Sequence, residues 1–187
     1  MANYYLDIET TGLDQKKDKI ITIQYQQIDS RDASPVGELK ILKEWELGEK
    51  EILKKFLEES GISESNVFSF IPVGFNLTFE HKFLLEKTKK YKLGAVDILL
   101  NRPFIDLKPM AVIMNGGSFK GSGLDKITGK PHDGSGVPDL YSKKRYKEIV
   151  EYIETETKEY LKFANWLYSR LPTLLKEFKE ENNIKKI

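Results

Sequence analysis

Apolar and polar residues alternate in the first part of the chain and later recur at helical spacing, which predicts strands followed by a mixture of helices and strands. The strand-like runs at the start cover residues 4–8, 20–28 and 41–47. In the second run, Ile21, Ile23 and Tyr25 are expected on one face. Because short polar segments connect the three runs, they predict an antiparallel meander.

The pattern beyond residue 50 changes repeatedly between helical and strand-like. Apolar residues three and four apart predict a helix over 50–59 that Gly61 ends. The elements predicted next are a buried strand over 67–75, a helix over 78–91 with Thr78 as its N-cap, a short strand over 104–107 and a helix over 109–114. From Ser142 the pattern is helical to about Arg170, and Pro172 is expected to begin a last helix. This order predicts an α/β fold with a mixed sheet.

A glycine-rich segment separates these elements from the C-terminal helices. Seven of the 13 glycines fall within residues 115–138, where one helical turn is expected over 124–127. Long connections of this kind are commonly mobile surface loops or active-site lids, and both interpretations stay open for this segment.

Length and composition predict one folded domain over residues 1–187. Of these 187 residues, 40 % are hydrophobic and 32 % are charged, which is unlike a disordered chain. The formal net charge of +1 argues against coating of nucleic acid through overall charge, but it permits a local basic groove. The N-terminus does not resemble a signal peptide, and the apolar run over 67–75 is too short to span a membrane. A cytoplasmic protein without a membrane partner is therefore expected.

The scarcity of cysteine and histidine limits the metal chemistry. The chain has no cysteine and two histidines, His81 and His132. A disulfide scaffold, a cysteine–zinc site and a histidine-rich metal site are therefore excluded. Any metal ion would be held mainly by oxygen atoms, which Mg²⁺ and Mn²⁺ prefer.

Two acids are paired on the first predicted strand. Asp7 and Glu9 are two residues apart, so both side chains point to one face, directly before the tight turn over 10–13. Neighbouring carboxylates repel each other and are costly to bury without a cation. The alternative is that both are simply solvated at the strand end, as most acids are.

Two further acids interrupt helical patterns. Glu156 takes a position in the apolar stripe of the long helix, one turn after Tyr152. Glu80 lies in the first turn of the helix over 78–91, where the helix dipole favours an anion. Taken alone, the former could be a half-exposed residue at the stripe edge and the latter a helix-stabilising charge.

Taken together, three segments resemble the three motifs of the DEDD superfamily of 3′–5′ exonucleases. They are Asp7-Ile8-Glu9-Thr10-Thr11-Gly12-Leu13-Asp14, Gly74-Phe75-Asn76-Leu77-Thr78-Phe79-Glu80-His81-Lys82-Phe83-Leu84 and Tyr152-Ile153-Glu154-Thr155-Glu156. The resemblance is greatest to the proofreading exonuclease domain of family B DNA polymerases. It implies an RNase H-like fold, a five-stranded mixed sheet flanked by helices.

The chain departs from this family at two positions. Glu80 and Glu156 stand where the family has aspartate. Because glutamate is one methylene longer and Mg²⁺ requires near-ideal octahedral geometry, the more tolerant Mn²⁺ is expected to support activity better. Tyr152, four residues before Glu156, matches the tyrosine variant of the family, whereas Val137 stands five residues after His132, where the histidine variant needs aspartate.

The resemblance implies hydrolysis of phosphodiester bonds with two divalent cations, Mg²⁺ or Mn²⁺. It implies that Asp7 bridges both cations, that Glu9 and Glu156 hold the one that activates water, and that Glu80 holds the other. Tyr152 would orient the attacking water. The residues implied in nucleotide binding are Thr10, Thr11, Gly12, Leu13, Asn76 and Phe79, with Leu13 as an apolar wedge against a base.

The expected substrate is the 3′ end of a single-stranded nucleic acid, with DNA favoured over RNA. Two alternatives remain open at this point. One is a catalytically weak or inactive nucleic-acid-binding protein on the exonuclease fold, which the two glutamates favour. The other is an oligoribonuclease that acts on short RNA. The sequence also leaves open a homodimer or a replication or repair partner.

Overall fold

A mixed five-stranded sheet lies at the centre of the computed structural model, which describes residues 2–130 and 134–184. The strands are β1 (Asn3–Thr10), β2 (Ile20–Ile28), β3 (Lys40–Lys43), β4 (Ile71–Gly74) and β5 (Ile105–Asp106), in the spatial order β3-β2-β1-β4-β5. The first three form the expected antiparallel meander, and β4 and β5 continue parallel to β1. The predicted α/β class with an RNase H-like mixed sheet is confirmed.

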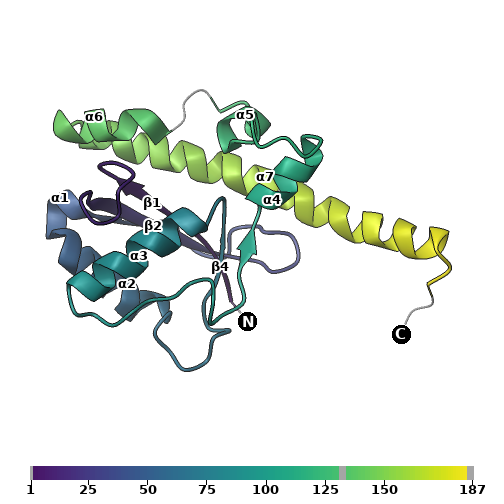
Figure 1. Cartoon of the computed structure of the whole chain (residues 1–187), viewed down its shortest axis with the longest axis horizontal. Helices are drawn as coiled ribbons and strands as arrows, with labels where there is room; N and C mark the ends of the chain where they lie inside the picture. Colours follow the sequence, from purple (N-terminus) through teal and green to yellow (C-terminus); the bar gives the residue numbers. More distant parts are fainter. Residues whose placement is uncertain (1, 131–133, 185–187) are drawn as a thin grey trace.

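Helices cover both faces of the sheet (Figure 1). They are α1 (Glu44–Leu47), α2 (Glu49–Ser60), α3 (Thr78–Lys90), α4 (Lys108–Met114), α5 (Leu124–Thr128), the 3₁₀ turn η1 (Gly134–Gly136), α6 (Val137–Ser142) and α7 (Tyr146–Glu181). Helices α2 and α3 pack on one face, and α4 to α7 lie on the other. Within the described ranges, no helix is long and apolar enough to cross a membrane.

The alternation of β1 divides its side chains between the two helical layers. Leu6 and Ile8 are buried against α2 and α3. Tyr5 points the other way, and its ring packs 4.7 Å from the ring of Tyr160 on α7. The same alternation places Asp7 on the α7 side of the sheet.

Ile21 does not share a face with Ile23 and Tyr25, as the sequence predicted, because a β-bulge interrupts β2. The register of β1 with β2 shifts between Glu9 and Thr10, which leaves Ile21 as the extra residue of β2. Ile21 therefore packs with Val137 and the first turns of α7, whereas Ile23 lies in the core under α2 and α3.

Three predicted element boundaries were wrong. The strand predicted over 41–47 ends at Lys43 and gives way to α1, in which Trp45 stacks on Tyr146 with ring centroids 4.6 Å apart. The strand predicted over 67–75 is confined to Ile71–Gly74. Pro172 does not begin a new helix but lies inside α7. A proline inside a helix removes one backbone hydrogen bond and crowds the preceding turn, but its fixed φ is compatible with a helix, and α7 continues through Pro172.

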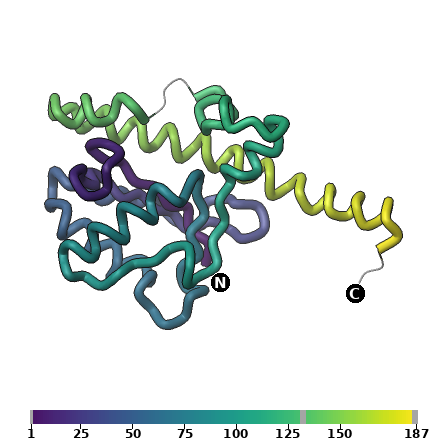
Figure 2. Tube along the Cα trace, in the orientation of Figure 1, coloured from purple at the N-terminus to yellow at the C-terminus, as the bar shows by residue number. Residues whose placement is uncertain are grey.

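The glycine-rich segment 115–138 is largely folded. It contains α5, where one turn was expected, then η1 and the start of α6. Figure 2 shows the stretch from α4 to α5 folded back over α7. Residues 131–133, including His132, lie outside the described residues. The described parts on both sides of that gap contribute to the site.

Candidate functional site

A cleft of about 320 Å³ opens where the carboxyl ends of β1 and β4 meet α7. The five predicted catalytic residues all line it: Asp7, Glu9, Glu80, Tyr152 and Glu156. They come from β1, from the first turn of α3 and from about the first three turns of α7. The fold thus gathers in one place acids that are far apart in the sequence.

Three of these acids are close enough to share a cation. Oxygen atoms of Asp7, Glu9 and Glu156 all lie within 4.8 Å of one another. The first two reach the cleft through the pleat of β1. The third stands in the helix stripe between buried Ile149 and buried Tyr160, which hold that face of α7 against the sheet.

A buried hydrogen-bond chain from β2 orients Asp7. Gln24 faces Asp7 in the β1–β2 register, and its Nε2 donates to Asp7 Oδ2 at 2.8 Å. Thr22 in turn donates to Gln24 Oε1 at 2.9 Å, and Tyr5 donates its hydroxyl to Asp7 Oδ2 at 3.3 Å. Sequence reasoning missed Gln24, because its position opposite Asp7 depends on the register of β1 with β2.

Burial and mutual repulsion raise the pKa values of the carboxyl groups. Burial and the charge of Glu156 raise the pKa of Asp7 to about 7. Burial and the charge of Asp7 hold the pKa of Glu9 and that of Glu80 well above the usual range. A bound cation would stabilise the ionised carboxylates and so offset both their burial and their mutual repulsion.

Among the acids of the cleft, Glu80 has a buried carboxyl oxygen that could serve as a metal ligand. Burial and the charge of Asp7 raise the pKa of Glu80, and its carboxyl group is hydrogen-bonded to that of Asp7. Its Oε2 is buried and has no hydrogen-bond partner among the described residues. Buried polar atoms are rarely left unpaired, so this oxygen fits a ligand of a bound cation.

The turn before α3 is fixed by Asp106 at the end of β5. Its carboxylate accepts hydrogen bonds from the backbone N–H groups of Asn76 and Leu77, at 2.8 and 2.9 Å. Thr78 is therefore not the N-cap that the sequence predicted, because the helix begins beside a carboxylate from a neighbouring strand. Asn76 takes a left-handed conformation in this turn, with φ of 71°. Sequence reasoning missed this role of Asp106.

Lys130 also lines the cleft, and the sequence did not predict its position there. Its Nζ lies 2.7 Å from Glu156 Oε1 and donates to the Tyr152 hydroxyl at 2.8 Å. That hydroxyl donates to Glu156, and burial together with the charge of Glu9 raises the pKa of Tyr152 far above its usual value. A single lysine within a glycine-rich segment carries no pattern that could have placed it here.

Only some of the residues predicted to bind nucleotide line a cleft. Asn76 and Phe79 line both the carboxylate cleft and an adjoining one of about 260 Å³, which Leu13 borders with 84 % of its surface exposed. The preceding residues of the turn are engaged internally. Thr10 donates to Gly12 O, and Thr11 Oγ1 accepts from Lys19 N.

The donor set fits a hard divalent cation. Closely spaced carboxylates with raised pKa values and an unpaired buried oxygen match the all-oxygen ligands of Mg²⁺ and Mn²⁺. Such a site can bind and polarise a phosphate ester.

Comparison with known proteins supports the same fold. A family model described as RNase_H superfamily matches residues 4–168. Two crystal structures of E. coli exonuclease I, with a dA16 and a dT13 oligonucleotide, superpose with TM-scores of 0.62 and 0.60 at 13 % and 14 % identity. They cover 95 % and 94 % of this chain. A product-bound structure of exonuclease I has a TM-score of 0.60 at 13 % identity, with 94 % of this chain covered.

The matches cover less than half of each exonuclease I chain. The chain spans 43 % of both oligonucleotide-bound exonuclease I chains and 45 % of the product-bound one. No curated protein matches the sequence.

Proposed function

The chain belongs to the RNase_H superfamily, and we propose that its carboxylate cleft is the centre of a metal-dependent 3′–5′ exonuclease acting on single-stranded nucleic acid. The observation that carries the proposal is the convergence of Asp7, Glu9, Glu80 and Glu156 on one cleft. The narrower likeness to family B proofreading domains, and to the tyrosine variant, rests on the three sequence motifs.

The residues that would hold cations follow from this arrangement. Asp7, Glu9 and Glu156 would hold one divalent ion, and Glu80 with Asp7 a second. Bound divalent ions would supply the positive charge that activates water and stabilises the leaving 3′ oxygen. Gln24 keeps Asp7 Oδ2 in a fixed orientation, as hydrogen-bond partners of metal ligands commonly do.

The other residues of the cleft would position the substrate. Tyr152 stays protonated, because burial and the charge of Glu9 raise the pKa of its hydroxyl, so it can donate a hydrogen bond to a water molecule. Phe79 and exposed Leu13 offer apolar surface to the terminal base, and Asn76 lines the same cleft. Stacking of this kind tolerates any base sequence, which suits a single-stranded end.

A second candidate function is a nucleic-acid-binding protein without hydrolysis. The ion pair of Lys130 with Glu156 favours it, because it engages an acid that the exonuclease needs. An oligoribonuclease would keep the chemistry and change the substrate to short RNA.

A panel of 5′-labelled substrates separates these functions. Single-stranded DNA, duplex DNA, long RNA and short RNA are incubated with Mg²⁺, Mn²⁺ or EDTA. We expect single-stranded DNA to shorten from its 3′ end one nucleotide at a time, faster with Mn²⁺ than with Mg²⁺ and not with EDTA.

The matched control is Asp7→Asn, which removes one charge and keeps the shape. It should abolish cleavage, because Asp7 is the proposed ligand of both ions. Equal cleavage by Asp7→Asn would contradict the proposal. Binding of all substrates without any cleavage would support the binding protein, and preference for short RNA the oligoribonuclease.

A further inference from the structure

Lys130 is the buried cation of the carboxylate cleft. It stands after Gly129, the residue that ends α5, and its side chain is only 3 % exposed. Its ammonium contacts Glu156 Oε1 at 2.7 Å and the Tyr152 hydroxyl at 2.8 Å, and it lies 4.4 Å from the centre of the Tyr152 ring. Glu156 at this end of the cleft is therefore paired with a buried ammonium group.

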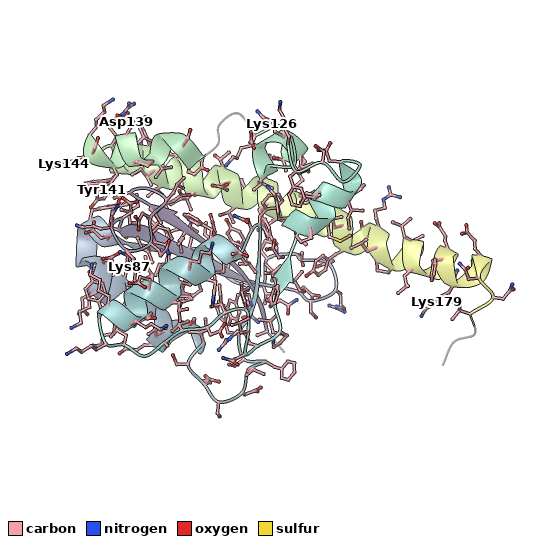
Figure 3. All side chains as sticks on the ribbon, in the orientation of Figure 1. Lys87, Lys126, Asp139, Tyr141, Lys144 and Lys179 are labelled. Carbon is pink, nitrogen blue, oxygen red and sulfur yellow. The ribbon has the colours of Figure 1, made fainter. Side chains whose placement is uncertain are left out.

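A plain structural ion pair is the simpler interpretation, and the protein contains one that is equally buried: Lys87, labelled in Figure 3, lies 3.8 Å from Glu49 with 1 % of its side chain exposed. Other lysine pairs are more exposed. Lys126 lies on α5 and pairs with Asp125 at 3.1 Å, with 69 % of its side chain exposed (Figure 3 labels it). Burying an ammonium group is costly and is compensated only by close partners of opposite charge. The partners of Lys130 are the residues that the proposed function assigns to a metal ion.

The acids at the two ends of the cleft differ in their ion-pair and hydrogen-bond partners. At the Lys130 end, Glu156 is paired with a lysine. At the other end, Glu80 Oε2 is buried without a hydrogen-bond partner among the described residues. Lys108 also lines the cleft, but within the described residues it forms no ion pair with Asp7 or Glu80. A lysine in direct contact therefore neutralises an acid at one end of the cleft and not at the other.

A divalent ion on Glu156 Oε1 would lie close to Lys130. Because metal–oxygen distances are about 2.1 Å, such an ion would be within about 5 Å of the ammonium nitrogen. Like charges at that distance in a partly buried site repel strongly. Lys130 and a divalent ion thus compete for the negative charge of Glu156.

We propose that Lys130 takes the place of one of the two divalent ions, so that the free protein binds a single divalent ion at the Asp7–Glu80 end of the cleft. This inference deepens the proposed exonuclease function and rests on it for the identity of the metal ligands. It assigns to Lys130 the positive charge that the second ion would provide beside Glu156.

The test counts Mn²⁺ ions bound to the full chain, by calorimetry and by electron paramagnetic resonance, without nucleic acid. We expect one ion per wild-type chain. Lys130→Met removes the charge and keeps an unbranched side chain, and it should admit a second ion at least about tenfold more tightly than wild type. Lys130→Arg should bind one ion, and Lys126→Met, the matched exposed control, should leave the count at one.

Two further variants locate the single ion, and they keep the test valid if Lys130→Met fails to fold. Glu80→Gln should weaken binding of the ion at least about tenfold, because it removes the open ligand, whereas Glu156→Gln should hardly change it. Two equally tight ions in wild type, or loss of the ion in Glu156→Gln with binding retained in Glu80→Gln, would overturn the inference and leave the exonuclease proposal standing. No Mn²⁺ binding by any variant would overturn both.

Discussion

The hydroxyl of Tyr152 joins the two charged groups at its end of the cleft. It accepts a hydrogen bond from Lys130 and donates one to Glu156. Tyr152→Phe keeps the ring and removes only this group. If the hydroxyl orients the attacking water, the single-turnover cleavage rate should fall by about 10²-fold. Loss of one hydrogen bond should lower the melting temperature by only about 2–4 °C. An unchanged rate would make Tyr152 a packing residue, the usual role of a buried tyrosine.

The raised pKa of Asp7 predicts how stability depends on pH. Burial and Glu156 raise this pKa from its ordinary value of 3.8 to about 7. The folded state then binds more protons than the unfolded state between these values, so the contribution of Asp7 is present below the lower one and is lost as pH rises through the higher one. We expect the metal-free protein to melt at a lower temperature at about pH 8 than at about pH 5, and Mn²⁺ to reduce the difference.

Asp7→Asn serves as the control for this pH dependence. The variant cannot ionise, so its melting temperature should fall less between the two pH values. Glu9 and Glu80 have pKa values raised in the same direction, so part of the dependence should remain. A melting temperature that rises with pH in wild type would show that burial does not hold these acids in their protonated form.

At this scale the sequence predicted the acids and missed their partners. Alternation on a strand gave Asp7 and Glu9 a common face, and Glu156 interrupts an apolar stripe, but each pattern alone also fitted a solvated acid. The resemblance of the three motifs to the DEDD superfamily was what joined these acids with Glu80 in one predicted site. Gln24 and Lys130 could not be placed, because their contacts depend on strand register and on the path of a loop. Such long-range positions leave no local pattern.

The turn between β4 and α3 sets the position of Glu80, and Gly74 leaves it no spare room. A Cβ atom at Gly74 would lie 2.5 Å from Leu77 Cδ2 and 2.9 Å from the backbone oxygen of Leu6. Gly74→Ala should therefore destabilise the protein by about 1–3 kcal/mol through overpacking and should lower cleavage by displacing α3. Gly37→Ala is the matched control, because nothing lies within 4 Å of a Cβ there. Equal melting temperatures for the two variants would contradict this account of the turn.

Elements with a strong periodic pattern were predicted well, and those decided by tertiary contacts were not. The bounds of β2 and the end of α2 at Gly61 follow from alternation and from a left-handed C-terminal glycine. The strand predicted over 41–47 was cut short because Trp45 stacks on Tyr146, a residue far along the chain. The start of α3 depends on Asp106 for the same kind of reason.

The last turns of α7 extend beyond the rest of the molecule (Figure 1), and Figure 3 shows Lys179 there with no other element beside the helix. The described residues after Leu171 are all exposed. A chain that stops at Leu171 should melt within about 2 °C of the full chain, because surface changes alter stability by about 0.5 kcal/mol or less. It should also keep its cleavage rate, since the cleft lies in the N-terminal third of α7. A large loss of stability in a thermal melt would show that these turns are packed in solution.

The central claim is that the cleft between β1, α3 and α7 binds a divalent cation and the 3′ end of a single strand. A crystal of the protein grown with Mn²⁺ and a short oligodeoxynucleotide, measured for anomalous scattering from manganese, tests it directly. The account predicts a manganese peak in contact with Asp7 and Glu80, with the 3′-terminal nucleotide beside Phe79. Manganese bound away from these carboxylates, or a strand that ends outside the cleft, would contradict it.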